Sequence, residues 1–357
     1  MSIPVARAPH PALAAWSALR AQASGRGALV TLVRTDGGSS KPVGAHLALA
    51  EDGRAYGSVT IGGCADGRAL AGAAEVLRSG VRERITVPLS EDDALALGLG
   101  CAGDVELLIE RVGFDAHDPL RESLDAAAAA LERGVRGVLV TPLGTVPGRL
   151  FVADDGARAG ATGDGIRDRA AAELALKALR DGEAAVGVHE AVDEQWLVQL
   201  LTPVRTILIV GATEIAAALC QLMAPLGWRS VLIDPRDELL AEPRFASATE
   251  HHAALPAELV ASRLGGASTA VVLVAHDYKV ELPVLRVALR AETPYVGMLG
   301  SRKRGTAVRA MLAEDGLSAA EIDRLRTPIG LPIGAQGAAE IAVSIVAELV
   351  AHWRGVK

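Results

Sequence analysis

TILIVGATEIAAALCQLMAPLGWRSVLIDP, residues 206–235, carries the clearest structural pattern in the chain. It predicts a buried strand over 206–210, a helix over about 215–226 and a second strand over 230–233. The alternation continues, with strands predicted at 270–274 and 294–298 and a last helix at about 338–353. Continuous β-branched strands that alternate with helices indicate a parallel sheet covered on both faces. We therefore predict an α/β fold with a Rossmann-like C-terminal domain over 205–357.

The first half of the chain lacks this strict alternation, and we predict an N-terminal α+β domain over 1–192. Helices are predicted at 11–23, 67–79, 120–133 and 166–180, with Gly80 closing the second. Strands are predicted at 28–33, 82–88, 104–111, 137–141, 150–153 and 184–189, with a hairpin over 45–58. Residues 193–204 are expected to connect the two domains, in a strand-like conformation. No internal repeat is expected.

Composition limits the classes of protein that this chain can belong to. The 357 residues are 50% hydrophobic and 22% charged, so each domain can bury a substantial core. A net charge of −7 gives no electrostatic reason to expect a nucleic-acid partner. No signal peptide and no membrane-spanning segment is predicted. The three cysteines show no disulfide or zinc spacing, so we expect a cytoplasmic protein with reduced thiols.

Glycine-wrapped cysteines mark the first candidate site. Gly62-Gly63-Cys64 follows the polar, glycine-rich segment 37–44, which contains Ser40, and a helix is predicted directly after it. Cys101 lies in a second glycine cluster at 98–103. Glycines let backbone N–H groups approach a ligand closely, and such groups attract anions and lower a thiol pKa. The alternative is that these glycines only make turns and that the cysteines fill space.

The second candidate site lies where the predicted parallel strands end, because ligands of such sheets bind beyond the carboxyl ends of the strands. Gly211, Asp234 and Gly300-Ser301-Arg302 each follow a predicted strand. Asp234 stands where a ribose-binding carboxylate is expected. However, Thr213 and Ala216 replace two glycines of the dinucleotide fingerprint, and Glu214 adds negative charge. This turn is therefore expected not to hold a dinucleotide.

Other residues leave alternatives open. The cations at 302–304 either bind a phosphate or form a positively charged face in contact with solvent. The stiff loop 327–335 around Gly330 either lines a ligand site or only connects two elements of the fold. His276-Asp277 is a candidate acid–base pair or a structural feature. His251-His252 is a weak metal candidate, and Cys220 is expected in the core.

Several blocks in order resemble the xanthine dehydrogenase accessory proteins of the XdhC/CoxI type, over nearly the full length. They are Ser39-Ser40 through Pro42 and Gly44, Gly57-Ser58, Gly62-Gly63-Cys64, and the segments 100–106, 296–302, 328–335 and 340–342. The chain departs from the family pattern at Gly211-Ala212-Thr213-Glu214, at Ala65-Asp66 and at Ala102. The resemblance therefore supports the cysteine sites more strongly than it supports the nucleotide site.

The resemblance implies a non-catalytic chaperone that binds molybdenum cofactor between its domains and assists sulfuration and delivery to a xanthine dehydrogenase-type hydroxylase. The implied partners are that hydroxylase and a cysteine desulfurase, and a homodimer is the default oligomer. Candidate cofactor-binding residues are Ser40, Gly62, Gly63, Cys64, Cys101, Gly211, Asp234, Gly300, Ser301, Arg302 and Gly330. Cys64 is the candidate contact to molybdenum or sulfur.

Two alternatives belong to other functional classes. One is an NAD(P)-dependent oxidoreductase that uses the Rossmann-like domain, with His276 or Tyr278 as proton donor. The other is a degenerate scaffold that only docks a partner enzyme. The missing glycines disfavour the first, and the retained cysteines disfavour the second.

Overall fold

The computed structural model describes residues 10–22, 25–36, 41–60, 63–89, 103–114, 117–266, 268–291 and 293–356. The chain forms two compact units, Met1–Pro203 and Val204–Lys357. Within the described ranges, no helix combines the length and the apolar character that a membrane crossing requires.

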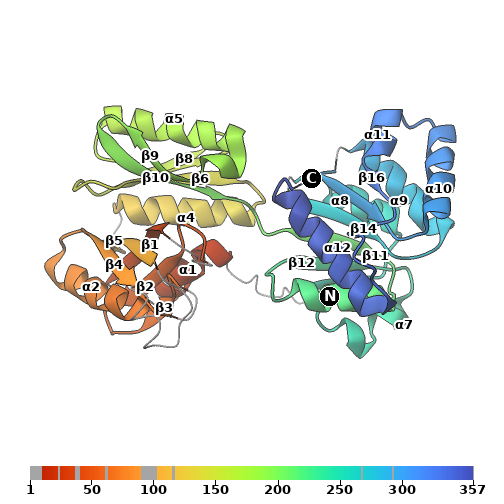
Figure 1. Cartoon of the computed structure of the whole chain (residues 1–357), viewed down its shortest axis with the longest axis horizontal. Helices are drawn as coiled ribbons and strands as arrows, with labels where there is room; N and C mark the ends of the chain where they lie inside the picture. The colour runs from red at the N-terminus through yellow and green to blue at the C-terminus, as the bar shows by residue number, and fades with distance from the viewer. Residues whose placement is uncertain are drawn as a thin grey trace. The chain divides into compact units, whose positions relative to one another are not determined.

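The second unit contains a six-stranded parallel sheet (Figure 1). Its strands are β11 (Thr206–Val210), β12 (Arg229–Ile233), β13 (Glu250–His252), β14 (Thr269–Leu273), β15 (Tyr295–Met298) and β16 (Leu325–Arg326). They lie in the order β13-β12-β11-β14-β15-β16, and every pair is parallel. The chain changes direction across the sheet between β11 and β14, so these two strands flank the topological switch point. The predicted Rossmann-like fold is confirmed, although the short β13 and β16 were not predicted.

Helices cover both faces of this sheet, as its apolar strands require. One core contains α6 (Glu214–Met223) and α12 (Gly337–Trp353), with α7 (Asp237–Leu240) and η3 (Pro243–Phe245) at its margin. The other contains α8 (Pro256–Arg263), α9 (Tyr278–Arg290), α10 (Arg302–Glu314) and α11 (Ala319–Asp323). Cys220 lies in the first core, where burial raises the pKa of its thiol to about 11.

The first unit contains two antiparallel five-stranded sheets of the same topology. The first part has η1 (Pro11–Leu13), α1 (Ala14–Gln22), β1 (Arg26–Thr35), β2 (His46–Ala50), β3 (Ala55–Gly57), α2 (Asp66–Ser79), β4 (Glu83–Leu89) and β5 (Gly103–Gly113). The second has α4 (Pro119–Glu132), β6 (Gly137–Pro142), β7 (Arg149–Ala153), β8 (Arg158–Ala161), α5 (Gly165–Asp181), η2 (Gly182–Ala185), β9 (Gly187–Ala191) and β10 (Glu194–Leu201). The sheet orders β3-β2-β1-β5-β4 and β8-β7-β6-β10-β9 correspond strand by strand.

The first unit is therefore an internal repeat, contrary to the expectation from sequence. The two copies also share their register: Val30 pairs with Leu47 and Ile109, and Val140 pairs with Leu150 and Val198. The segment expected to connect the domains holds β10, which lies between β6 and β9. It belongs to the second sheet of this unit.

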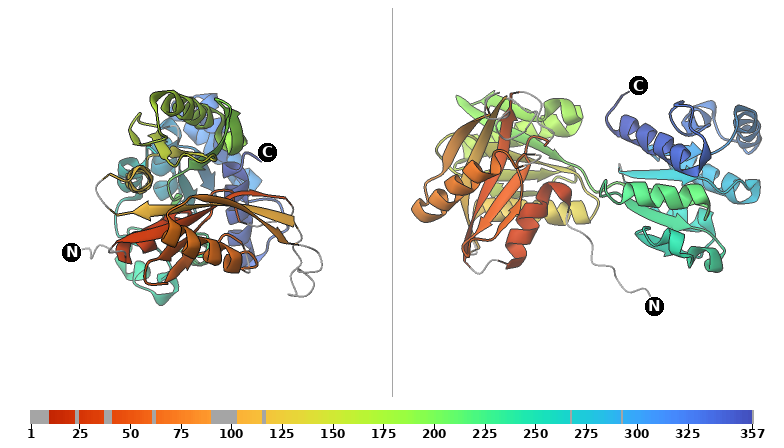
Figure 2. Two further views of the ribbon diagram at one scale, coloured as in Figure 1. Left: turned by 90° about the vertical axis from the view of Figure 1, so that its left-hand side faces the viewer. Right: turned by 60° about the horizontal axis from the view of Figure 1, so that its bottom comes forward.

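Three layers of apolar side chains hold the repeat together. The core between the two sheets contains α1 and α4, and α4 runs between the sheets in both Figure 1 and Figure 2. The outer face of the first sheet packs on α2, and the outer face of the second sheet packs on α5. The helix positions correspond as well: Ala69, Ala73 and Val76 of α2 match Ala171, Ala175 and Ala178 of α5, and all six are fully buried.

Polar side chains join the two copies. The shared register makes Thr31, His46 and Glu110 of the first copy equivalent to Thr141, Arg149 and Gln199 of the second, and all six are buried. Arg149 crosses to the first copy and donates to Glu110 at 3.0 Å. Gln199 donates to the Gly44 carbonyl at 3.1 Å. These buried polar residues, like the apolar layers, therefore occupy equivalent positions in the two copies of the repeat.

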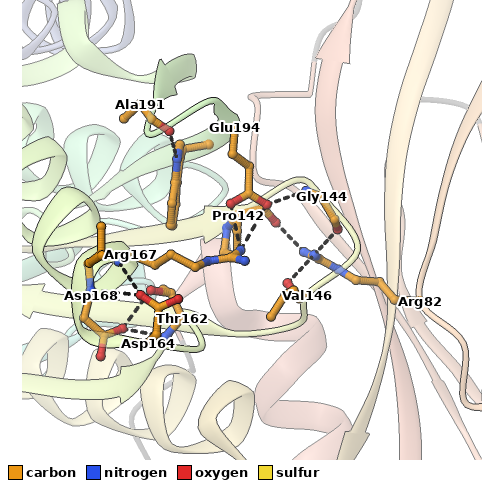
Figure 3. A network of polar contacts seen from close by, with 12 residues as sticks. Arg82, Pro142, Gly144, Val146, Thr162, Asp164, Arg167, Asp168, Ala191 and Glu194 are labelled. Atoms are coloured by element: carbon orange, nitrogen blue, oxygen red, sulfur yellow. Dashed lines mark hydrogen bonds and ion pairs between the residues drawn. The ribbon is translucent and has the colours of Figure 1, made fainter.

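Arg82 makes the reverse connection, from the first copy to the second (Figure 3). Its guanidinium donates to the carbonyl oxygens of Pro142 at the end of β6 and of Gly144 and Val146 after it, with distances of 2.6 Å to Gly144 and 3.0 Å to Val146. It also lies 3.1 Å from Glu110. A single arginine thus fixes the loop after β6 against the first sheet.

Candidate functional site

The turn before α2 places Cys64 at the surface of the first unit. Gly63 has a left-handed φ of 73°, and Cys64 is half-buried directly before the helix. The Asp66 carboxylate accepts hydrogen bonds from the Val59 N–H at 3.2 Å and from the Thr60 hydroxyl at 3.5 Å. Thr60 Oγ1 in turn accepts from the Ala65 N–H at 3.3 Å. Thr60 and Asp66 therefore hold the backbone on both sides of the thiol.

The second copy of the repeat has a related contact between a threonine and an aspartate, and it has no thiol. There, Asp168 accepts from both the N–H and the hydroxyl of Thr162 at 2.7 Å, which Figure 3 shows beside Asp164. The threonine and aspartate are six residues apart in both copies, so Ile166 stands where Cys64 stands. In the second copy, however, the helix already begins at Gly165, one residue before that position.

The first copy thus starts its helix later than the second copy and places a half-buried cysteine in the turn before the helix. A pair of glycines before a cysteine is by itself weak evidence for a site. The two copies of the repeat otherwise match, however, so the different turn at Cys64 calls for a specific explanation. Ser40, Gly62 and Cys101 lie outside the described residues.

The second candidate site follows the carboxyl ends of β11 and β14. Gly211 has a φ of 109°, and a Cβ at this position would lie 2.7 Å from the Ala275 Cα. Only glycine fits this turn. Thr213 caps α6 by accepting from the Ala216 N–H at 3.3 Å, and Glu214 is exposed at the helix start. The close approach of Gly211 to Ala275 brings the two strand ends of the switch point together.

Asp234 is buried after β12, and both of its oxygens are used within the protein. Oδ2 accepts from the Ala212 N–H at 2.8 Å and Oδ1 from the Arg236 N–H at 3.0 Å, while the Arg236 guanidinium bonds both oxygens at 2.8 Å. Burial opposes ionisation, but the hydrogen bonds from Arg236 and Ala212 outweigh it and lower the pKa of Asp234. The carboxylate expected to face a ribose fastens the Gly211–Ala212 turn.

Gly300, Ser301 and Arg302 follow the neighbouring strand β15. Ser301 caps α10 by accepting from the Arg304 N–H at 3.2 Å, and Arg302 is exposed beside it. Arg304 is different, because its guanidinium forms an ion pair with the fully buried Glu281. Of the three cations considered from sequence, Arg304 is held internally, whereas Arg302 and Lys303 face solvent.

The loop around Gly330 packs on α12. The φ of Gly330 is 99°, its N–H donates to Glu348, and Ile329 enters the core that contains α12. Gly330 therefore has a structural reason to be glycine.

The histidine pairs have other partners than the sequence suggested. His276 lies near Glu281 and Arg304, while the Asp277 carboxylate caps α9 at the Lys279 N–H, 2.8 Å away. His251 contacts the Phe245 carbonyl, and the described residues contain no cluster of three potential metal ligands. Sequence reasoning missed Glu281, because its burial inside a helical pattern leaves no local signal.

A two-fold repeat with the half-buried thiol of Cys64 and a Rossmann-type unit with the tight Gly211 turn define the class of this chain. The model for the XdhC Rossmann domain matches residues 207–349, and the model for the XdhC and CoxI family matches residues 21–88. The chain belongs to the XdhC and CoxI family.

Two curated relatives and one solved structure are similar to this chain over most of its length. The molybdenum cofactor insertion chaperone PaoD of Escherichia coli is 29% identical over 93% of this chain and 85% of its own length. A probable xanthine dehydrogenase subunit of Bacillus subtilis is 24% identical over 90% of this chain and 92% of its own. A crystal structure described as a xanthine dehydrogenase from Bacillus halodurans has a TM-score of 0.75 at 24% identity, covering 98% of this chain and 97% of that one. This last likeness shows the shared fold.

Proposed function

We propose that this chain binds molybdenum cofactor, assists its sulfuration and delivers it to a xanthine dehydrogenase-type hydroxylase. The observation that carries the proposal is the alignment with PaoD, which is named as a molybdenum cofactor insertion chaperone and spans nearly all of this chain. A cysteine desulfurase would supply the sulfur. The cofactor is the cargo of such a protein, and the hydroxylase is its recipient.

The donor groups of both units suit this cargo. A cysteine thiolate is both a metal ligand and a nucleophile, so Cys64 is a fitting contact to molybdenum or sulfur. The cofactor also carries a phosphate, which exposed cations such as Arg302 and Lys303 can bind. A carrier needs only reversible contacts of these two kinds. The departure of the Cys64 turn from its repeat partner supports a role for the thiol beyond packing.

Purification from cells that make molybdenum cofactor tests the proposal. Bound pterin and molybdenum would be measured on wild type, Cys64→Ala and Cys220→Ala. Cys220→Ala is the thiol control, because that side chain is fully buried in the Rossmann-type core. We expect Cys64→Ala to keep the wild-type Tm and to retain less pterin and molybdenum per folded molecule. Cys220→Ala should lower the Tm and retain wild-type amounts per folded molecule.

The opposite pattern would refute the proposal. If wild type carries neither pterin nor molybdenum and binds NAD(P), the oxidoreductase alternative takes its place. If Cys64→Ala unfolds the first unit while the folded fraction keeps its pterin, the cysteine has a packing role only.

A further inference from the structure

His276 has a backbone conformation that its side chain does not favour. It follows β14 at the switch point with a left-handed φ of 59°, next to the residue that Gly211 approaches. Side chains with a Cβ adopt this region at a cost, whereas glycine adopts it freely. The His276 side chain is exposed, so burial of the imidazole does not offset that cost. A left-handed residue other than glycine is a reason to ask what its side chain does, although histidine is among the side chains found there most often.

A buried carboxylate holds this conformation in place. Glu281, in the first turn of α9, is fully buried, and its Oε1 accepts from the His276 N–H at 3.1 Å. Its Oε2 accepts from Arg304 of α10. Arg304 also donates to the Leu299 carbonyl at 2.9 Å and lies over the Tyr278 ring, 4.8 Å from its centroid. The loops after β14 and β15 are thereby fixed to one another.

The same network sets the orientation of the imidazole. Arg304 Nη1 lies 3.5 Å from His276 Nδ1. An arginine nitrogen only donates, so this contact favours the tautomer that accepts at Nδ1 and carries its proton on Nε2. This nitrogen can then donate to a ligand from an exposed position. The ring presents a hydrogen-bond donor at the strand ends.

Charge along this edge of the sheet is divided. The exposed cations Lys279, Arg302 and Lys303 follow β14 and β15, on the side of His276, together with the exposed Asp277, whose carboxylate caps α9. The exposed carboxylates Glu214, Asp237 and Glu238 follow β11 and β12, where the exposed Arg236 is paired with Asp234. An anion is therefore favoured on the β14–β15 side and disfavoured at the start of α6, where a dinucleotide would place its pyrophosphate.

We propose that His276 donates through Nε2 to an anionic oxygen of the ligand, a phosphate or similar oxyanion, bound at the ends of β14 and β15. Glu281 and Arg304 are positioning residues that hold the ring. This inference rests on the proposed function, whose cargo carries a phosphate. It places that phosphate beside His276.

Two substitutions separate the ring from its backbone. His276→Gly removes the ring and suits the left-handed backbone, so the Tm should rise slightly while pterin retention falls. His276→Asn also tolerates this backbone and keeps an acceptor for Arg304, but its amide nitrogen lies closer to the main chain and cannot donate from the position of Nε2. His251→Asn, at an exposed histidine of β13 in the same unit, is the control.

The experiment combines two readouts on the full chain. Pterin per folded molecule would be measured after purification from cofactor-making cells, and the ring Cε1–H signal of His276 would be followed by NMR during titration with pyrophosphate. We expect severalfold less pterin on both His276 variants, wild-type retention on His251→Asn, and a pyrophosphate-dependent shift of the His276 signal. Equal pterin on wild type and His276→Asn would overturn this inference and leave the carrier function standing. Wild type without pterin would overturn both.

Discussion

Arg149 Nη2 lies 3.0 Å from Glu110 Oε2, and both side chains are buried between the two sheets of the first unit. The residues belong to different copies of the internal repeat. Burial lowers the pKa of the Arg149 guanidinium, while the Glu110 carboxylate acts against this change. The pair therefore joins the two copies through a buried positive charge and a buried negative charge, each of which stabilises the other.

Arg149→Met should destabilise the first unit strongly, because it leaves the Glu110 carboxylate buried with Arg82 alone. Breaking a buried pair of this kind costs about 3 to 5 kcal/mol of unfolding free energy. Denaturant unfolding of wild type and variant measures the difference. The double variant Arg149→Met/Glu110→Leu should recover part of the loss, since it removes the buried carboxylate that Arg82 alone would have to balance. A loss below about 1 kcal/mol for the single variant would contradict this view.

His46 should make the first unit sensitive to mild acid. Burial, with the nearby Arg149 charge, lowers the pKa of His46 to about 3 from its ordinary value of 6.5. Between these values the unfolded chain binds a proton that the folded chain does not, so stability is lost as the pH falls from 6.5 toward 3. The slope approaches about 1.4 kcal/mol per pH unit. His46→Gln should flatten the dependence measured by denaturant unfolding across this range. An unchanged slope would show that His46 does not titrate this way.

Gly211→Ala should damage the Rossmann-type unit more than an ordinary left-handed glycine substitution does. At Gly316 the φ is 81° and a Cβ would meet nothing within 4 Å, so Gly316→Ala should cost only the backbone strain, about 1 kcal/mol. At Gly211 the added Cβ also meets the Ala275 backbone, so the cost should reach about 3 kcal/mol or more. Thermal unfolding compares the two. Similar losses at both positions would mean that the turn can move aside.

Asp66→Ala should free the Cys64 turn. The variant removes the acceptor that holds Val59 and Thr60, so the half-buried thiol becomes more accessible. Iodoacetamide should then alkylate Cys64 severalfold faster than in wild type, as peptide mass spectrometry can measure. Asp168→Ala breaks the related contact of the second copy and should leave this rate unchanged. Equal alkylation rates in Asp66→Ala and wild type would show that Asp66 does not control access to the Cys64 thiol.

The second unit was predictable because its signal is local. Each long apolar strand, such as Thr206–Val210, must be buried on both faces and is followed by a helix, so periodicity alone indicates a parallel sheet. The two-residue β16 has no periodicity to detect.

The repeat was harder to see. The similar segments GALVT at 27–31 and GVLVT at 137–141 are the sequence signal of the repeat. The linker between β1 and β2 is longer than the linker between β6 and β7. This difference in length hides the alignment of the two copies.

The candidate sites depended on facts that a sequence does not contain. Glycines stand at both the Gly211 turn and the Cys64 turn, where Gly211 and Gly63 have left-handed backbones. The left-handed backbone of His276 and the burial of Glu281 come from tertiary packing, so nothing in the local pattern indicates them. Asp234 stood at the expected position, but its bonds to Arg236 and Ala212 appear only in three dimensions.

Transfer of cofactor is the most direct test of the central claim. Wild type purified from cells that make molybdenum cofactor would be mixed with a cofactor-free xanthine dehydrogenase-type hydroxylase, and hydroxylase activity would be followed with time. We expect activity to appear in proportion to the pterin carried, and Cys64→Ala, added at equal protein concentration, to restore much less. A hydroxylase that stays inactive although the wild-type chain carries pterin and molybdenum would contradict the account.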